Sequence, residues 1–419
     1  MNFKIKMNIG FNGLKVLFGF AVMMQSFIEI RTADADYQSD YARWQYRITD
    51  SEFIINNTKP DRDGQAKVFV NRLRDKENRY DGSPYLLTQV TDDKIRGIKS
   101  RLQASFDHLV VIIHGFLDEA NSSPAWHSTL GDAIRHHQPR TEVFAVDWRE
   151  GAQTLKYKAA VLNAGETANM LAIFLRRILP LANERQISVH IIGHGLGAHI
   201  GRKVVWRLRS LHFPIYRLTC LDPFQFEYEY EDYYGNGNGN KEAQLTDVIH
   251  TDGYVNGFGD PRAFGTVDFY MNNLDRTINN QPGCKKTPGE SVRHLLNRAG
   301  ALPLNVDPKS RHRVLNRIFE SLKVSLCSHG RAVEYFIEAV IDPRCKFTGR
   351  SLEEFGKQRV LGLDTFTTLD YSTIRGLKVY ADTNSSYRFC PHAPPKPTVI
   401  NMDKRINIIE NVSVLSRFH

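Results

Sequence analysis

One stretch, Gln186–Val205, constrains the fold of this chain more than any other. An apolar, β-branched run at 187–192 leads directly into the glycine-rich sequence GHGLG at 193–197. A helical spacing of apolar residues begins immediately afterwards, at Ile200. A buried strand, a tight turn and a helix are therefore expected in immediate succession, as in proteins whose strands and helices alternate.

The residues alone leave three interpretations of this turn open. Strand, turn and helix form the context of a nucleophile elbow, G-x-S-x-G, but the middle residue here is Gly195, which has no hydroxyl or thiol. The letters G-x-G-x-x-A from Gly193 to Ala198 also form a variant dinucleotide fingerprint, which would indicate a nucleotide-binding oxidoreductase. The third interpretation is an ordinary tight turn. We favour a hydrolase-like scaffold that lacks its nucleophile.

The first 35 residues have the pattern of a secretory signal peptide. Basic residues, an apolar stretch at 16–24 and a small-x-small sequence at Ala33–Ala35 follow one another. The apolar stretch is too short to span a membrane comfortably, and no later transmembrane run is visible. We expect a secreted, extracellular chain that begins near Asp36, with an uncleaved signal anchor as the alternative.

Composition narrows the class of partner. The chain carries a formal net charge of +9 at pH 7, which favours anionic surfaces such as lipid headgroups or heparin-like polyanions. We expect no nucleic acid, no cofactor and no metal. The hydrophobic content of 42% supports a packed globular protein.

Five cysteines in a secreted chain predict two disulfides and one free thiol. Cys220 lies in a buried-looking strand and is expected to be the free one. Four N-x-S/T sequences predict N-glycosylation, at Asn56, Asn121, Asn384 and Asn411.

Apolar runs alternate with helical patterns along the chain. Runs that are apolar throughout are typical of parallel strands covered on both faces. The alternation predicts an α/β fold with a mainly parallel sheet and helices on both faces. The expected strands are 65–73, 109–114, 143–148, 187–192, 218–222 and 247–250, with a long helix at 162–179.

Eight motifs in a fixed order make a resemblance specific. They are VVIIHGF (110–116), VFAVDWREGA (143–152), IIGHGLGAHIG (191–201), LDP (221–223), TDVIHTD (246–252), VDFYMNN (267–273), QPGC (281–284) and CSHGRA (327–332). Together they resemble the secreted pancreatic-lipase-like family of α/β hydrolases, which includes lipases, phospholipases A1 and yolk proteins. The resemblance covers roughly residues 65–390 and implies a single α/β-hydrolase domain at 36–419.

The resemblance implies a role for each of five residues. Gly195 stands at the nucleophile position, Asp222 matches the catalytic acid and His329 the base, in the chain order of α/β hydrolases. Backbone N–H groups of Phe116 and Leu196 would form the oxyanion hole, which does not depend on the missing serine. Without the resemblance, Asp222 would be a turn residue and His329 a surface histidine.

The resemblance further implies that a disulfide between Cys284 and Cys327 encloses a lid insertion at 285–326. With Cys220 free, Cys345 and Cys390 remain for the second disulfide.

Two helices are expected inside the insertion. One runs from a capping sequence at 287–290 to Gly300, and Asp307-Pro308 opens the other. The second helix sets an apolar stripe opposite Arg313 and Arg317, so it either lies on an anionic lipid surface or folds back over the pocket. The stripe consists of Leu315, Ile318, Phe319 and Leu322.

The stretch between Pro223 and Thr246 departs from the family's calcium loop. Only Glu242 could serve there as an acidic ligand, so no structural calcium is expected. Its acid-flanked tyrosines are either sulfation sites, as in the related yolk proteins, or part of a solvated loop; they are Tyr228, Tyr230, Tyr233 and Tyr234. After Cys390 the remaining chain is too short for a C-terminal lipid-binding β-sandwich, and we expect none.

Two functions follow from the resemblance. The first is a catalytically inactive pseudo-lipase with a lipid-binding, partner-binding or storage role. The second is an active triglyceride lipase or phospholipase A1-type carboxylic ester hydrolase that uses an unorthodox nucleophile or an activated water. Losing the nucleophile of a serine triad costs about a million-fold in turnover, which favours the first. Secretion and the retained Asp222 and His329 disfavour the oxidoreductase.

Overall fold

The computed structural model describes the central part of the chain, all of it within the compact unit Arg43–Ala393. Several predicted features lie outside the described residues: the predicted signal peptide, Asn56, Asn121, Asn411, the tyrosines at 228–234, Glu242, the capping sequence at 287–290 and the tail from 392. The described ranges are 67–73, 84–120, 126–181, 184–225, 243–253, 257–272, 281–284, 292–302, 306–342, 345, 347–351, 358–363, 365, 376–385 and 388–391.

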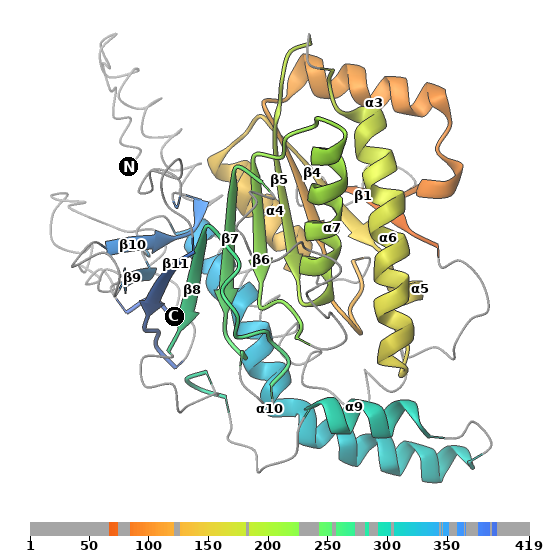
Figure 1. Cartoon of the computed structure of the whole chain (residues 1–419), viewed down its shortest axis with the longest axis vertical. Coiled ribbons are helices and arrows are strands. Elements are labelled where there is room, and N and C mark those ends of the chain that lie inside the picture. Colours follow the sequence, from red (N-terminus) through yellow and green to blue (C-terminus); the bar gives the residue numbers. More distant parts are fainter. Residues whose placement is uncertain are drawn as a thin grey trace, which may run out of the picture. The chain divides into compact units, whose positions relative to one another are not determined.

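One 11-stranded sheet organises the described residues, in the order β10-β9-β11-β8-β7-β6-β5-β3-β4-β1-β2 (Figure 1). Pairing is parallel from β4 across to β11, and antiparallel where β1, β2, β9 and β10 join the edges. The strands are β1 Phe69–Leu73, β2 Tyr85–Leu86, β3 His108–Ile113, β4 Thr141–Asp147, β5 Ser188–His194, β6 Arg217–Leu221, β7 Leu245–His250, β8 Val267–Met271, β9 Phe347–Ser351, β10 Gln358–Leu361 and β11 Leu377–Ala381.

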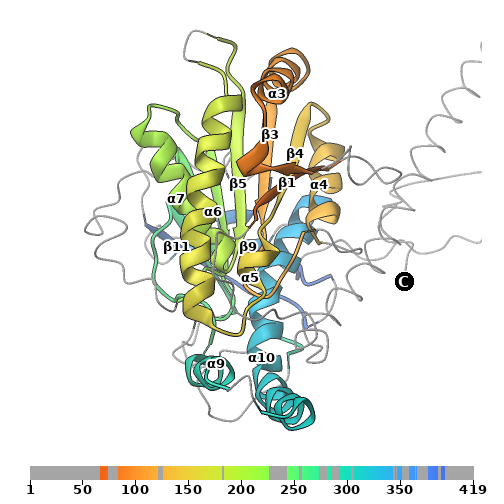
Figure 2. The ribbon, with the colours of Figure 1, turned by 90° about the vertical axis from the view of Figure 1, so that its right-hand side faces the viewer.

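Helices cover both faces of this sheet. Figure 2 shows α6 and α7 on one face and α4 with part of α10 on the other. In Figure 1, α10 bends between a part that runs beside α9 and a part that runs along the sheet. The helices are α3 Asp92–Ser105, α4 Trp126–His137, α5 Arg149–Ala152, α6 Tyr157–Ile178, α7 Leu196–Ser210, α9 Val292–Gly300 and α10 Pro308–Ile341, with a 3-10 turn at Leu87–Gln89.

The predicted α/β fold is confirmed, and burial explains why the strands are apolar throughout. Every residue of β4, β6 and β7 is buried, because helices cover both faces of the sheet's centre. Burying one Val, Ile or Leu side chain stabilises the fold by about 1.5–3 kcal/mol relative to leaving it exposed.

The helix predicted to open at Asp307-Pro308 is present as α10. The Asp307 side chain accepts a hydrogen bond from the backbone N–H of Ser310 (2.9 Å), and Pro308 is the first helical residue. The apolar stripe on this helix is buried in the core, at 1–2% exposure, so the helix folds back onto the protein with Arg313 and Arg317 exposed. Of the helices in the described ranges, none is both long and apolar enough to cross a membrane.

Candidate functional site

Gly195 occupies a tight turn between β5 and α7. Its backbone angles, φ 55° and ψ −116°, lie in a region that residues with a β-carbon rarely adopt. Its neighbours must also be glycines: a β-carbon on Gly193 would meet the Gly197 carbonyl oxygen at 2.2 Å, and one on Gly197 would meet the Ile113 carbonyl oxygen at 2.3 Å. The strand, the tight turn and the helix therefore follow one another directly, as predicted, and the glycines let their backbones pack in close contact.

The structure brings Asp222 and His329 together across 107 residues of sequence. Asp222 follows β6 at the edge of the sheet where Gly195 follows β5, and His329 lies in α10. The Asp222 Oδ2 and His329 Nδ1 atoms are 2.6 Å apart, and both side chains are buried. With its Nδ1–H donated to the carboxylate, the imidazole turns Nε2 toward Gly195.

The imidazole of His329 packs directly against Gly195. A β-carbon added to Gly195 would lie 2.9 Å from Nε2 of His329 and 3.7 Å from Cδ2 of Phe224. The first of these distances is shorter than β-carbons tolerate, so the histidine uses space that is open only because residue 195 is a glycine. The pair can take or give a proton at Nε2, but residue 195 has no side chain with which to exchange it.

Aromatic rings wall the site. The ring centroids of Phe224 and Phe258 lie 5.6 and 5.3 Å from that of His329. Tyr157 stacks on Phe224 at 4.9 Å, and Phe116 meets Tyr157 edge-on at 5.3 Å. Two apolar rings, Phe224 and Phe258, therefore flank the His329 imidazole.

Phe116 and Leu196, the predicted oxyanion-hole residues, follow two adjacent strands. β3 and β5 pair in parallel with Ile113 opposite Gly193, so the chain beyond each strand emerges at the same edge of the sheet. Leu196 is the first residue of α7, where backbone N–H groups have no partner within the helix. Both residues thus lie at the end of the sheet that carries Gly195 and Asp222.

A loop after β7 fixes the Asp222 carboxylate, a role that was not predicted from the sequence. Oδ1 of Asp222 accepts hydrogen bonds from the backbone N–H groups of Thr251 (2.8 Å) and Asp252 (3.0 Å). Gly259 packs against the same carboxylate, since a β-carbon there would lie 2.5 Å from Oδ1. The available signal was the end of the TDVIHTD motif, where the loop begins.

Asp252 stabilises this loop as a second buried acid. Its Oδ2 accepts a hydrogen bond from the Phe258 N–H (2.7 Å), which positions the ring beside His329. Burial, followed by the charge of Asp222, raises the pKa of Asp252 well above its ordinary value. The shift favours the protonated form of Asp252 beside the Asp222 carboxylate.

Two further histidines hold the backbone around the site. The His194 ring nitrogen Nε2 lies 3.2 Å from the His329 carbonyl, and the His199 Nε2 lies 2.6 Å from the Phe224 carbonyl. Burial is the main cause that lowers the pKa of each to about 3. Both rings are neutral near pH 7 and act as hydrogen-bond donors to those carbonyl oxygens.

The disulfide between Cys284 and Cys327 is present, with the two Cα atoms 5.9 Å apart. Gln281, whose role was also not predicted from the sequence, anchors the same segment. Its side-chain amide donates to the carbonyls of Thr251 (2.9 Å) and Met271 (3.0 Å), and its backbone N–H donates to Ser328 Oγ (3.0 Å). The chain before the disulfide is thereby bound both to the sheet and to the helix that carries His329.

The second predicted disulfide is not formed in this structure, where Cys345 and Cys390 are free, buried thiols. The carboxylate of Glu338 explains the arrangement, because it accepts from the Cys345 thiol (3.3 Å) and from the Cys390 N–H (3.3 Å). Burial raises the pKa of Glu338 to about 7, and burial also raises the pKa of the Cys345 thiol. Cys220 is free and buried in β6, as predicted.

Asn384 is the one predicted glycosylation site within the described ranges, and it is exposed. Its side-chain nitrogen donates to the carbonyls of Arg388 (2.7 Å) and Cys390 (3.3 Å). Glycosylation at Asn384 stays a prediction. Within the same ranges, no group of three or more His, Cys, Asp or Glu side chains is placed to hold a metal ion.

Curated proteins similar to this chain include lipases and phospholipases. Pancreatic triacylglycerol lipase of Myocastor coypus is 27% identical over 237 residues, which cover 55% of this chain and 45% of that protein. Inactive pancreatic lipase-related protein 1 of Mus musculus is 30% identical over 243 residues, covering 55% and 43%. Phospholipase A1 of Vespa velutina is 28% identical over 260 residues, covering 59% and 70%. The chain thus spans about half the length of the pancreatic relatives that it matches.

A solved structure, lipase B of Aspergillus fumigatus, is similar at 13% identity over 68% of this chain and 74% of that chain, with a TM-score of 0.26, too low to add to the argument. The family described as Lipase matches residues 35–296, which is more than half of the chain. Gly195 and Asp222 lie within that match, and His329, which is bonded to Asp222, lies beyond it. The chain belongs to the Lipase family.

Proposed function

We propose that this chain is a secreted, catalytically inactive member of the Lipase family that binds lipid at the site around His329. One observation carries the proposal: His329 Nε2 packs against Gly195, at the turn where a nucleophile elbow has its serine. Acyl transfer through a covalent intermediate needs a hydroxyl or thiol beside the base, and residue 195 supplies neither.

The retained groups favour binding. The aromatic rings of Phe224 and Phe258 offer apolar contacts to a lipid chain. His329, held by Asp222, offers a ring nitrogen to a polar headgroup. Storage of the lipid, its transport and its presentation to a partner would all use this one binding site.

The test compares binding with hydrolysis in one preparation. The secreted protein is purified, its co-purifying lipids are identified by mass spectrometry, and turnover of short acyl esters and labelling by a fluorophosphonate probe are measured. We expect bound lipid, no specific turnover and no label. A protein that carries no lipid and binds no added fatty acid or phospholipid would contradict the binding role.

A second candidate function is ester hydrolysis by an activated water. The 2.6 Å contact between Asp222 and His329 favours it, because this pair is the proton-transfer part of a triad. Turnover by the parent protein that His329→Ala abolishes would establish this function in place of the inactive one.

We also propose that the protein binds anionic surfaces through its α9 and α10 helices. Their outer faces carry the exposed side chains of Arg293, Arg298, Lys309, Arg313 and Arg317. The overall net charge of +9 acts in the same direction. Anionic phospholipid and heparin-like polysaccharide are the two chemistries to compare.

A further inference from the structure

The large apolar side chains that are exposed gather on one layer of the fold. Among the described residues, all of them lie on α6, on α7 or just beyond the ends of these two helices. Single exposed apolar side chains are ordinary on a protein surface, but their collection on one layer indicates a surface for interaction. They are Leu162 (73% exposed), Ile173 (62%), Leu181 (51%), Trp206 (53%) and Leu211 (43%), referred to below as the α6–α7 face.

These side chains lie on the side of the helices that faces away from the sheet. Leu162 and Ile173 are 11 residues apart, about three helical turns, so they lie on the same side of α6. Leu171, which is buried, lies on the inner side of that helix. On α7, Trp206 is exposed while Val205 next to it is buried in the core. Both helices therefore bury one apolar side and carry further apolar side chains on the outer side.

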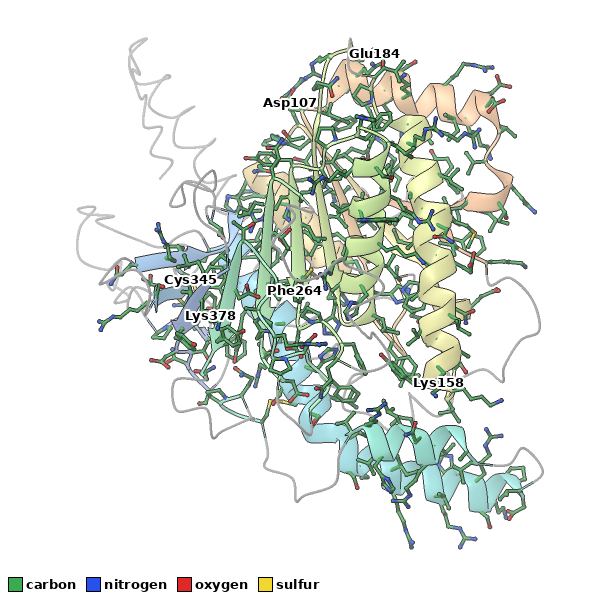
Figure 3. The ribbon with its side chains drawn as sticks, in the orientation of Figure 1. Asp107, Lys158, Glu184, Phe264, Cys345 and Lys378 are labelled. Carbon is green, nitrogen blue, oxygen red and sulfur yellow. A yellow bond between two sulfur atoms is a disulfide. The ribbon has the colours of Figure 1, made fainter. Side chains whose placement is uncertain are left out.

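The two helices run in the same direction. α6 leads from β4 to β5 and α7 from β5 to β6, and these strands are parallel to one another. The helices also lie side by side (Figure 1). Leu181 follows the end of α6 and Leu211 follows the end of α7, so both leucines lie at the same end of the layer. In Figure 3, Glu184 marks this end and Lys158 marks the other.

The site around His329 lies at the opposite end of α7. Gly195 directly precedes this helix, and His329 packs against that turn. Trp206 comes ten residues after Leu196, the first helical residue, which is about 15 Å along the helix axis. A ligand on the α6–α7 face is therefore held without entering the site around His329.

Basic residues outnumber acidic ones on both helices. α7 contains four basic residues and neither aspartate nor glutamate, and α6 contains three basic residues and a single acid, Glu166. At the margin of the layer, Asp92 of α3 is paired with Arg177 of α6 (2.5 Å), so this acid has a cationic partner of its own. The layer that carries the exposed apolar side chains is therefore also positively charged.

Two exposed arginines lie beside the apolar side chains. Arg176 comes three residues after Ile173, and Arg209 comes three residues after Trp206. A spacing of three residues places both members of each pair on the same side of their helix. Because both arginines are exposed, each helix presents a cation and an apolar side chain to the same neighbour.

We propose that the α6–α7 face binds the surface of an anionic lipid bilayer. Leucine and isoleucine side chains can enter the boundary between headgroups and acyl chains, and the amphipathic ring of Trp206 suits the headgroup level. Arg176 and Arg209 would pair with the phosphate and carboxylate groups of the headgroups. A protein partner fits less well, because charged residues are depleted from the core of protein interfaces, whereas here they alternate with the apolar side chains.

This surface differs from the α9 and α10 helices and from the site around His329. The outer faces of α9 and α10 expose arginines, but none of their large apolar side chains in the described ranges is exposed, so they attract anions by charge alone. Salt screens that attraction, while the α6–α7 face keeps its apolar contribution. The inference also holds whether or not the site around His329 takes a lipid molecule.

The first test asks whether Trp206 enters a bilayer in the full-length protein. The chain has four tryptophans, of which Trp126 and Trp148 are buried, and the Trp206 signal is the difference between the parent and Trp206→Phe. Vesicles of phosphatidylcholine and phosphatidylserine carry bromine atoms on their acyl chains, which quench a tryptophan only at short range. We expect a blue shift and several-fold quenching of this signal. Absence of binding, or bound protein whose Trp206 signal is not quenched, would overturn the proposal.

The second test measures affinity for the same vesicles by flotation. Ile173→Ser with Leu211→Ser removes apolar contact, and Arg176→Glu with Arg209→Glu reverses two charges. All four side chains are exposed, so both variants should fold as the parent does. We expect each variant to bind at least about tenfold more weakly than the parent. Affinities equal to that of the parent would count decisively against the proposal.

Two further variants separate this face from cations elsewhere. Arg350→Glu with Lys378→Glu makes the same change of charge on β9 and β11, near the other edge of the sheet (Figure 3). It should bind as the parent does, and a loss equal to that of the α6–α7 variants would assign the attraction to net charge and refute the proposal. Arg313→Glu with Arg317→Glu should leave Trp206 quenched in the bound protein. Loss of that quenching would place the contact on α10 instead.

A second copy of the chain is the other occupant to test. Light scattering without lipid should give the same mass for the parent and for Ile173→Ser with Leu211→Ser. A parent dimer that this variant dissociates would identify the second copy as the occupant and overturn the proposal.

Discussion

Nε2 of His329 lies 2.9 Å from the point where a β-carbon on residue 195 would stand. An active triad needs that space for the side chain of its nucleophile, so the histidine and the glycine fit each other as a pair. Restoring the nucleophile requires the imidazole to withdraw while it keeps its 2.6 Å bond to Asp222. This requirement makes residue 195 the sharpest place to test the proposed function.

Gly195→Ser should restore part of a triad. The serine would lie beside His329, which accepts its proton while Asp222 orients the ring. The positive φ at this position and the contact with Nε2 should lower the free energy of unfolding by about 1–3 kcal/mol. We expect burst kinetics with short acyl esters and labelling by a fluorophosphonate probe, once circular dichroism has shown that the variant is folded.

Gly195→Ala is the matched control for this variant. It introduces the same strain and the same β-carbon without the hydroxyl, so it should lose similar stability and remain unlabelled. A folded serine variant that neither turns over nor labels would show that the remaining groups are not arranged as a triad.

The sequence predicts those site residues that directly follow a recognisable strand. Gly195 and Asp222 follow the parallel strands β5 and β6, and apolar runs identify both strands. His329 could be placed only through the family resemblance, since nothing in its helix points to a residue 107 positions earlier. The contacts of Asp252 and Gln281 were not predictable, because each depends on how loops from separate strands meet in space.

The thiols provide a second prediction. Peptide mapping without reduction should find Cys284 joined to Cys327, and a thiol reagent in denaturant should label Cys220, Cys345 and Cys390. The reason is that Glu338 accepts a hydrogen bond from the protonated Cys345 thiol. A peptide that joins Cys345 to Cys390 would show that oxidation displaces this contact.

Glu338 should make stability depend on pH. Burial raises its pKa from 4.5 to about 7, so the folded state holds a proton that the unfolded state has released. Its contribution is therefore present in full below pH 4.5 and is lost as the pH rises to about 7, a change of about 3 kcal/mol. Urea unfolding at the two ends of this window measures the change.

Glu338→Gln separates this effect from other titrating groups. The amide keeps an acceptor oxygen for its neighbours and cannot ionise, so the variant should lose this part of the pH dependence. An unchanged difference between the two pH values would assign the effect to another residue.

Binding to immobilised heparin should weaken with salt. Attraction between exposed charges is screened beyond about 10 Å at 0.1 M salt. We therefore expect this protein to elute from heparin at a lower salt concentration than a protein whose interface with heparin excludes water. Arg313→Glu with Arg317→Glu should shift elution to lower salt, because both side chains are exposed on α10. Arg96→Glu, an exposed change on α3, is the control. No retention at low salt, or equal elution of all three proteins, would contradict this prediction.

The disulfide between Cys284 and Cys327 has a consequence for how this protein can evolve. It holds the two ends of the intervening stretch 5.9 Å apart, and Gln281 and His329 lie just outside those ends. The exposed side chains of this stretch, such as Arg313 and Arg317, can change without altering the positions at which the loop leaves and rejoins the scaffold, while the apolar stripe of α10 stays in the core. Natural variation can therefore reshape the outer surface of this insertion while the imidazole itself stays in place, and new ligand preferences can arise there without a redesign of the scaffold.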